Sequence, residues 1–445
     1  QLLVEAGTGT GKSMAYLLPA VAVAVRRGEQ VVISTKTIQL QDQLFHKDIP
    51  TLRAVLATAA EGAAAPALPP TFTAALVKGR SNYLCLRRWT ALRRAANVPK
   101  EELRTLVKIL LWLQSTDTGD RAELRLLPGE EATWARVMAT QDACSPSTCS
   151  YNRRGQCYLT RARRQAEAAH LVIVNHALLL SDMVTNSQIL PEYKHLIIDE
   201  AHRLEDEATA QFGYTVDRRG LLDALDRLVR AGAGGRQEGL VPDVQTHLRV
   251  SKVPVAAQTT ADRAAGTLGE AVAAGRRAAA DLFSRLEAFI EAQEAGAEGH
   301  DPRARLTQTA RRQRGWEEVE GAWEELGRHL VTVNLGLAEL AAVLERLDPK
   351  TLIEYDTLAC DLQATLRANA ELRLHLNTVI ANPDPGMVYW CEANRASHSA
   401  ALHAAPLHVA DTLIAGLYQG KQTVVLASAT LTTDGSFSYV RERLG

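Results

Sequence analysis

The sequence predicts an α/β protein in which a parallel sheet of short buried strands is interrupted by two long insertions. Three observations support this prediction. Short apolar runs alternate with amphipathic segments near the start of the chain, which is typical of parallel strands joined by helices. A glycine-rich turn separates the first apolar run from the first amphipathic segment. A later apolar run ends in two adjacent carboxylates, a feature expected where the strands of an open parallel sheet end.

The strands and helices of the sheet are expected in the following order. The first part of the chain predicts a strand at 2–4, a helix at 14–26, a strand at 30–34 and a helix at 38–45. The pattern stops at the Ala- and Pro-rich segment 61–73, which is typical of a linker. It resumes with strands at 170–176, 194–199, 386–391 and 423–427. These runs are mostly apolar, as strands are when helices cover both faces of a parallel sheet.

Two segments do not follow this alternation, and we interpret them as insertions. Residues 76–165 contain 17 Lys and Arg against 8 Asp and Glu, together with four of the six cysteines. Residues 205–385 are almost wholly helical in pattern and rich in Ala, Leu, Arg and Glu. The sheet domain is therefore expected to consist of residues 1–75, 166–204 and 386–432.

Length and composition exclude several classes of protein. The 445 residues suffice for more than one domain. No signal-peptide pattern is present, and the apolar run at 17–25 is too short to span a membrane, so we expect a soluble cytoplasmic protein. Six cysteines are too few for a secreted disulfide scaffold. The chain starts at Gln1, without Met and directly before the first expected strand, so we expect it to be a fragment.

The glycine-rich turn has the residues that a phosphate-binding loop needs. Its members are Ala6, Gly7, Thr8, Gly9, Thr10, Gly11, Lys12 and Ser13. Glycines let successive backbone N–H groups close around phosphates, and the following helix adds its positive N-terminal end. Lys12 would reach the terminal phosphates of ATP, and Ser13 would ligate Mg²⁺. The alternative is an Ala/Gly/Thr-rich turn that binds nothing.

The two carboxylates at the end of the strand at 194–199 are Asp199 and Glu200. Asp199 would hold the Mg²⁺ shell, and Glu200 would orient and polarise the attacking water. Either carboxylate alone could instead cap the helix that follows. The phosphate-binding loop upstream favours the catalytic interpretation.

Four cysteines of the basic insertion form a candidate metal site. They are Cys85, Cys144, Cys149 and Cys157, with gaps of 58, 4 and 7 residues. Four thiolates can hold zinc or a 4Fe-4S cluster, and this spacing does not choose between the two. Some of the four could instead be buried thiols, which is our interpretation of the isolated Cys360 and Cys391.

Basic and aromatic residues flank these cysteines. The basic ones are Lys78, Arg80, Arg87, Arg88, Arg93, Arg94, Arg153, Arg154, Arg161, Arg163 and Arg164, and the aromatic ones are Tyr83, Trp89 and Tyr151. Cationic side chains bind phosphates and aromatic rings stack on bases, so this segment is expected to contact single-stranded DNA through residues such as Arg80, Tyr83 and Arg88. The alternative is that the charge only offsets four thiolates.

Five motifs in order give the chain a resemblance to the DinG-type helicases of superfamily 2, the bacterial relatives of the XPD and FANCJ helicases. The segments 6–13, 34–41, 199–202 and 427–431 resemble motifs I, Ia, II (the DEAH box) and III, and 78–85 resembles the entry into the family's iron-sulfur domain. The resemblance covers nearly the whole chain.

The resemblance implies a RecA-like motor domain with an inserted iron-sulfur domain at 76–165, holding a 4Fe-4S cluster, and a helical arch at 205–385. It implies that Thr35, Lys36 and Gln39 contact the DNA backbone, that Ser428 and Thr430 couple the ATP site to DNA, and that His202 relays between them. It further implies 5′ to 3′ translocation on single-stranded or forked DNA by a nucleoid-associated monomer, with RNA–DNA hybrids as further substrates.

The same resemblance places the start of a second motor domain at 433–445, with most of it missing. We therefore expect this chain to bind nucleotide but to hydrolyse ATP poorly. Two other functions remain open. One is a nucleotide-gated single-stranded DNA-binding protein that does not unwind, with a structural metal site; the other is a nuclease-coupled enzyme, for which no second acidic metal site is found.

Overall fold

We describe the protein from a computed structural model. The described residues are 10–61, 71–94, 99–140, 144, 149–184, 189–232, 235–293, 302–394, 399–432 and 435–445. The chain divides into two compact units, which are described separately. The first unit consists of Gln1–Ala139, Arg154–Phe212 and His408–Gly445, and the second of Thr140–Arg153 and Gly213–Leu407.

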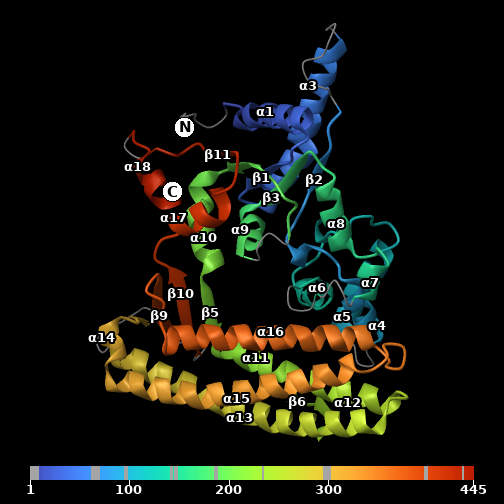
Figure 1. Cartoon of the computed structure of the whole chain (residues 1–445), viewed down its shortest axis with the longest axis vertical. Helices are drawn as coiled ribbons and strands as arrows, with labels where there is room; N and C mark the ends of the chain where they lie inside the picture. Colours follow the sequence, from blue (N-terminus) through green and yellow to red (C-terminus); the bar gives the residue numbers. More distant parts are fainter. Residues whose placement is uncertain are drawn as a thin grey trace. The chain divides into compact units, whose positions relative to one another are not determined.

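The first unit contains a five-stranded parallel sheet in the order β11-β4-β1-β3-β2 (Figure 1). Its strands are β1 (Val31–Thr35), β2 (Ala74–Leu76), β3 (Leu171–Asn175), β4 (His195–Asp199) and β11 (Thr423–Ala427). The α/β fold with a parallel sheet is therefore confirmed. The strand expected at 2–4 lies outside the described residues, and β2, at the end of the linker, was not predicted.

Helices cover both faces of this sheet. They are α1 (Lys12–Arg27), α2 (Ile38–Gln43), η1 (Leu44–Asp48), α3 (Ile49–Glu61), α9 (His176–Val184), η4 (Ala201–Arg203), α10 (Leu204–Phe212), α17 (Ala410–Leu413), η6 (Ile414–Tyr418) and α18 (Ser438–Leu444). Neighbouring residues of β1 are buried on opposite faces of the sheet. Val32 packs with residues of α9 and α10, and Ile33 packs with residues of α1. Both faces being buried explains why the strands are apolar throughout their length.

The basic insertion has a small core of its own within the first unit. Its elements are η2 (Arg80–Asn82), α4 (Leu86–Arg94), α5 (Lys100–Trp112), η3 (Arg121–Glu123), α6 (Glu130–Val137) and α8 (Tyr158–Glu167). Tyr83, Trp89, Ile109 and Trp134 are among its buried residues. This core lies inside the predicted insertion at 76–165, although residues 140–153 group with the second unit.

Long helices make up most of the second unit, and Figure 1 shows α13, α15 and α16 side by side. Its helices are α7 (Ser150–Arg153), α11 (Arg218–Leu228), α12 (Leu240–Val250), α13 (Val255–Gln293), α14 (Gln308–Arg311), α15 (Arg314–Glu345) and α16 (Tyr355–Ile380). Phe283 and Trp316 are fully buried between them. None of the described helices combines the length and the apolar surface needed to cross a membrane.

Two antiparallel sheets complete this unit, and one of them corrects a predicted boundary. The larger sheet has the order β5-β10-β9-β8, and β6 (Arg230–Ala231) pairs with β7 (Gln237–Glu238). Its strands are β5 (Tyr214–Asp217), β8 (Arg303–Arg305), β9 (Met387–Asn394) and β10 (Ser399–Pro406). The run predicted at 386–391 is thus β9 and not part of the parallel sheet, to which the chain returns only from His408. The Ala-rich strand β10 has little intrinsic strand preference, so sequence alone did not predict its pairing.

A partly exposed cluster of polar side chains joins the amino ends of β1 and β4. Glu29, just before β1, lies 2.9 Å from both Lys194 Nζ and His195 Nε2, at the start of the neighbouring strand β4. Hydrogen bonds from His195 and Lys194 lower the pKa of Glu29 to about 2. The folded chain therefore favours the ionised form of this carboxyl.

We predict that Glu29→Gln destabilises the first unit in a pH-dependent way. The lowered pKa means that the stabilisation is complete above the ordinary value of 4.5 and is lost as the pH falls from there to about 2. Urea unfolding should show a lower midpoint for the variant at pH 7 and a shrinking difference from wild type below pH 4.5. The exposed Glu167→Gln serves as the control, and a difference independent of pH would contradict the assignment.

Candidate functional site

Parallel pairing brings the carboxyl ends of four strands to one edge of the sheet. Thr35 pairs with Asn175, Ser34 with Ile198, and Ala427 with Asp199. The residues that follow these strands must therefore lie at this carboxyl edge. They are Lys36, His176, Glu200 and Ser428.

The phosphate-binding loop lies beside this edge in part. Residues Ala6, Gly7, Thr8 and Gly9 are outside the described part of the chain, which begins at Thr10. Gly11 precedes α1 with a φ of 80°, a left-handed conformation that glycine adopts without strain. A Cβ there would meet no atom within 4 Å, so the backbone angle, not space, favours glycine. Lys12 and Ser13 then begin α1.

A tyrosine connects the start of α1 to the acidic strand end. Tyr16 lies one turn after Ser13, and its buried hydroxyl donates a hydrogen bond to Asp199 Oδ2 at 3.1 Å. Burial raises the pKa of Asp199, while the Tyr16 hydrogen bond and the charge of Lys12 oppose the rise. The nearby Ser13 hydroxyl also acts on Tyr16 and opposes the rise in the pKa of its hydroxyl that burial causes. The predicted Mg²⁺-binding groups Ser13 and Asp199 therefore share one partner that the sequence interpretation missed.

Glu200 has an unusual backbone conformation at the end of β4. Its φ of 56° is in the left-handed region, which among the described non-glycine residues only Glu354 shares. This conformation costs about 1–2 kcal/mol for a residue with a Cβ. The turn directs the chain from β4 into η4, and its strain marks the predicted catalytic carboxylate as a special position.

The predicted coupling residues meet the acidic turn. His202 Nδ1 lies 2.7 Å from Ser428 Oγ and 3.3 Å from Glu200 Oε2. The backbone N–H of Thr430 donates to the same Ser428 Oγ at 3.2 Å. The structure thus places the DEAH segment and the segment after β11 in direct contact, although they are more than 220 residues apart in sequence.

A second histidine at this edge was not predicted. His176 follows β3, is fully buried, and its Nδ1 lies 2.7 Å from Ser34 Oγ at the end of β1. Burial lowers the pKa of His176 to about 4, although the backbone of Glu200 and Asp199 opposes this. The ring is therefore neutral at pH 7. A polar residue directly after an apolar strand was the signal that could have revealed it.

Two of the predicted DNA-contacting residues are buried, which corrects their assignment. Thr35 is 0% exposed at the end of β1, and Tyr83 is 3% exposed, with its hydroxyl accepting a hydrogen bond from the Lys78 backbone N–H. A ring inside the insertion core cannot stack on a base. Lys36 and Gln39 are exposed, whereas Arg80 and Arg88 are half-buried. Arg88 also donates to the Met138 carbonyl at 2.8 Å.

The four predicted cluster ligands are divided between the two compact units. All four thiols are half-buried and none forms a disulfide. Cys85 and Cys157 pack against the same insertion core, whereas Cys144 and Cys149 group with the second unit. Within the described ranges, no three His, Cys, Asp or Glu side chains gather closely enough to hold a metal ion. Cys85 and Cys157 thus share one hydrophobic core, and the ligand set stays a prediction.

A buried lysine ties the basic insertion to the sheet. Lys78 is 3% exposed, and its Nζ lies 2.8 Å from Asp120 of the insertion and 3.0 Å from Asp42 of α2. Burial lowers the pKa of Lys78, but the hydrogen bonds and charges of the two carboxylates outweigh this and raise it overall. The side chain of Gln41 adds a hydrogen bond to the Val77 carbonyl at 3.1 Å. The helix after the predicted DNA-contacting Lys36 is therefore joined to the insertion.

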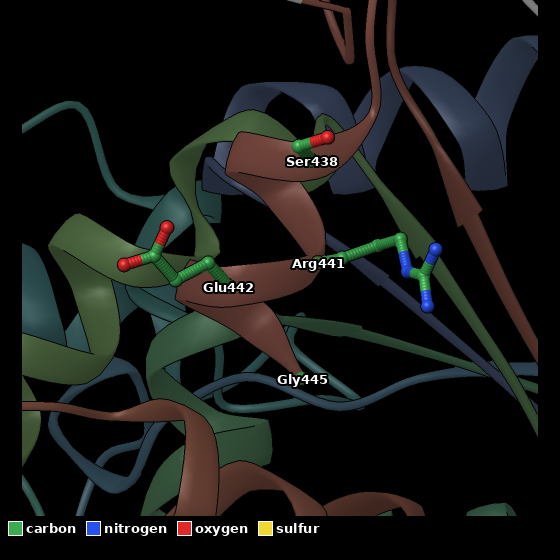
Figure 2. Close-up of a pocket in the computed structure, with 4 residues that line it drawn as sticks. All are labelled: Ser438, Arg441, Glu442 and Gly445. Atoms are coloured by element: carbon green, nitrogen blue, oxygen red, sulfur yellow. The ribbon is translucent and has the colours of Figure 1, made fainter.

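Figure 2 shows a surface hollow on α18, lined by Ser438, Arg441, Glu442 and Gly445. The side chains of Arg441 and Glu442 point to opposite sides of the helix. None of these residues belongs to a predicted motif, so this hollow is not the candidate nucleotide site.

Known proteins with similar sequences agree with the motif pattern. Over its full length the chain is 27% identical to the 3′-5′ exonuclease DinG of Bacillus subtilis strain 168, and the match covers 45% of that protein. It is also 29% identical over its full length to the ATP-dependent DNA helicase YoaA of Haemophilus influenzae, of which the match covers 58%. A third match, to the ATP-dependent helicase DinG of Mycobacterium tuberculosis strain H37Rv, has 39% identity. It covers 47% of this chain and 32% of that protein.

The chain spans about half the length of the relatives that it matches from end to end. No family model matches it. A solved XPD helicase aligns with 97% of the chain at a TM-score of 0.42 and 12% identity, a likeness too low to support a conclusion about the fold.

We predict that Lys78→Met, which keeps the length of the side chain but removes its charge, destabilises the first unit. Two carboxylates are left without their cation, and breaking a buried ion pair in this way costs about 3 kcal/mol. The exposed Lys47→Met on η1 should change the free energy of unfolding by less than about 0.5 kcal/mol. Denaturant unfolding measures both.

Adding Asp120→Asn to Lys78→Met should recover part of the lost stability, because it removes one of the two unpaired charges. Equal costs for Lys47→Met and Lys78→Met would contradict the role given to this ion pair.

Proposed function

We propose that this chain, which is related to the DinG and YoaA proteins along its whole length, acts in an ATP-dependent DNA helicase. The observation that carries the proposal is the contact of His202 with both Glu200 and Ser428 at the carboxyl edge. It links the predicted ATP-hydrolysing carboxylate to the segment predicted to sense DNA.

At the nucleotide site, Lys12 would bind the terminal phosphates, and the N-terminal end of α1 would add backbone N–H groups. Ser13 and Asp199 would hold Mg²⁺, which neutralises the charge developing on the transferred phosphoryl group. Tyr16 donates to Asp199 and lies near Ser13, so it would help to position these two side chains before the ion binds. Glu200 would orient the attacking water.

Coupling would run through the hydrogen bonds of Ser428. A shift of Glu200 on hydrolysis would move His202, and Ser428 would pass that shift to Thr430 and β11. Such discrete rearrangements of packed hydrogen-bonded groups are how small changes at one site reach another. The exposed side chains of Lys36 and Gln39, after β1, would contact the DNA backbone.

We further propose the finer features that the resemblance implies. The protein translocates 5′ to 3′ on single-stranded DNA, opens forked DNA or RNA–DNA hybrids, and acts as a monomer at the bacterial nucleoid. Cys85, Cys144, Cys149 and Cys157 would hold a 4Fe-4S cluster that stabilises the basic insertion.

A nucleotide-gated DNA-binding protein without unwinding activity is the second candidate. The buried positions of Thr35 and Tyr83 do not distinguish the two candidates, because both candidates bind DNA and both use the same ATP residues. Unwinding of a 5′-tailed duplex by the protein that carries this chain distinguishes the two.

We predict that Lys12→Ala strongly weakens nucleotide binding without unfolding the chain. Lys12 is half-buried at the start of α1 and belongs to none of the hydrophobic clusters, so the thermal midpoint should stay within a few degrees of wild type. Losing a charge-assisted phosphate contact should weaken the Kd of a fluorescent ATP analogue by about tenfold or more. An unchanged Kd would exclude the proposed phosphate-binding role; the exposed Lys47→Ala is the control.

We predict that the anaerobically purified protein contains about four irons and four acid-labile sulfides per chain, with a broad visible absorption. Cys85→Ser should lower the iron content and loosen the insertion core that Cys85 contacts. Zinc without acid-labile sulfide would contradict the proposed 4Fe-4S cluster, but it would not affect the proposed nucleotide site.

A further inference from the structure

The buried side chain of His176 has no role in the function proposed above. It is the first residue of α9, held there because Asn175 Oδ1 accepts a hydrogen bond from the Leu178 N–H at 3.0 Å. The ring is fully buried at the same carboxyl edge as the acidic turn. An ordinary core position would be filled by an apolar side chain at less cost in desolvation.

The two ring nitrogens of His176 differ in their surroundings. Nδ1 is bonded to the Ser34 hydroxyl at 2.7 Å. Nε2 is buried and makes no hydrogen bond of good geometry to the residues that the structure describes, although the backbone of Asp199 and Glu200 lies close enough to the ring to interact with it. Because β1 separates β3 from β4 in the sheet, a ring that reaches this backbone spans the end of β1.

The position of Glu200 gives the unused nitrogen a partner. Glu200 adopts the left-handed φ of 56°, so the turn that carries it is strained while Nε2 is unsatisfied. A small movement of the turn toward the ring would complete a hydrogen bond from Nε2–H to a backbone carbonyl of Asp199 or Glu200. Nδ1 would keep accepting from Ser34, which fixes the tautomer that carries the proton on Nε2.

We propose that His176 is a positioning residue that holds the acidic turn through Nε2 when Mg²⁺ and nucleotide are bound. It contacts neither phosphate nor metal. Its effect is on the direction of the Asp199 and Glu200 side chains, through their backbone, and it anchors that turn to the end of β1 that precedes Lys36. This inference rests on the proposed nucleotide site.

The test uses two substitutions of His176. Each one replaces one ring nitrogen by an amide group and removes the other. His176→Asn retains a polar group near the position of Nδ1 but has nothing at Nε2, and His176→Gln retains an amide donor near Nε2. The control is His170→Asn, at the opposite end of β3, where the imidazole bonds to Thr73. The Kd of a fluorescent ATP analogue is measured for each with excess Mg²⁺ and with EDTA, and thermal midpoints are recorded.

We expect His176→Asn to lose about tenfold in nucleotide affinity with Mg²⁺ and less than about twofold with EDTA, the size of one charge-free hydrogen bond. His176→Gln should stay within about threefold of wild type in both conditions, and His170→Asn should match wild type. Equal losses with Mg²⁺ and EDTA, or equal losses for Asn and Gln at position 176, would show a packing role and overturn the proposal.

The proposed function fails in a different way. If the wild-type chain does not bind the analogue, or if the Lys12→Ala variant binds it with the same affinity as wild type, the proposed nucleotide site is wrong. The inference about His176 is then wrong as well. Nucleotide binding that depends on Lys12 but is indifferent to both His176 variants overturns the inference alone.

Discussion

Parallel pairing of four strands is the constraint on which the candidate site depends. The strands β1, β3, β4 and β11 come from three distant parts of the chain, and their pairing sets the position of every residue that follows them. A register shift of one residue would turn Asp199 or Ser428 toward the opposite face of the sheet. Such a shift would also disturb the close packing of side chains on both buried faces, so this packing protects the geometry of the polar edge.

The two edges of the sheet differ in what holds them. At the amino edge, Glu29 joins β1 to the start of β4 by an ion pair with Lys194 and a hydrogen bond with His195. At the carboxyl edge, the contacts are hydrogen bonds with a strained turn and an unsatisfied ring nitrogen, which leaves that edge free to change its bonding. The contacts of Glu29 hold the amino edge in one arrangement, whereas the hydrogen bonds at the carboxyl edge can rearrange. This difference suits a site in which bound nucleotide changes the contact between His202 and Ser428. Lys78 extends the fixed part into the basic insertion.

The sequence predicted the residues that carry the proposed chemistry better than it predicted their neighbours. Lys12, Asp199, Glu200 and Ser428 follow from glycine spacing, strand ends and motif order, which are local patterns. Tyr16 and His176 were missed because their importance arises from contacts between segments more than 140 residues apart. The same cause explains the errors: Thr35 and Tyr83 looked accessible in sequence, and their burial depends on strands and helices that pack on them from elsewhere.

The most direct test of the proposed link between nucleotide and DNA is the rate of ATP hydrolysis by the protein that carries this chain, measured with and without single-stranded DNA. We expect DNA to raise the rate several-fold, since the contact of His202 with Ser428 would transmit strand binding to Glu200. A rate that does not respond to DNA, in protein whose nucleotide binding is intact, would contradict the coupling across the carboxyl edge.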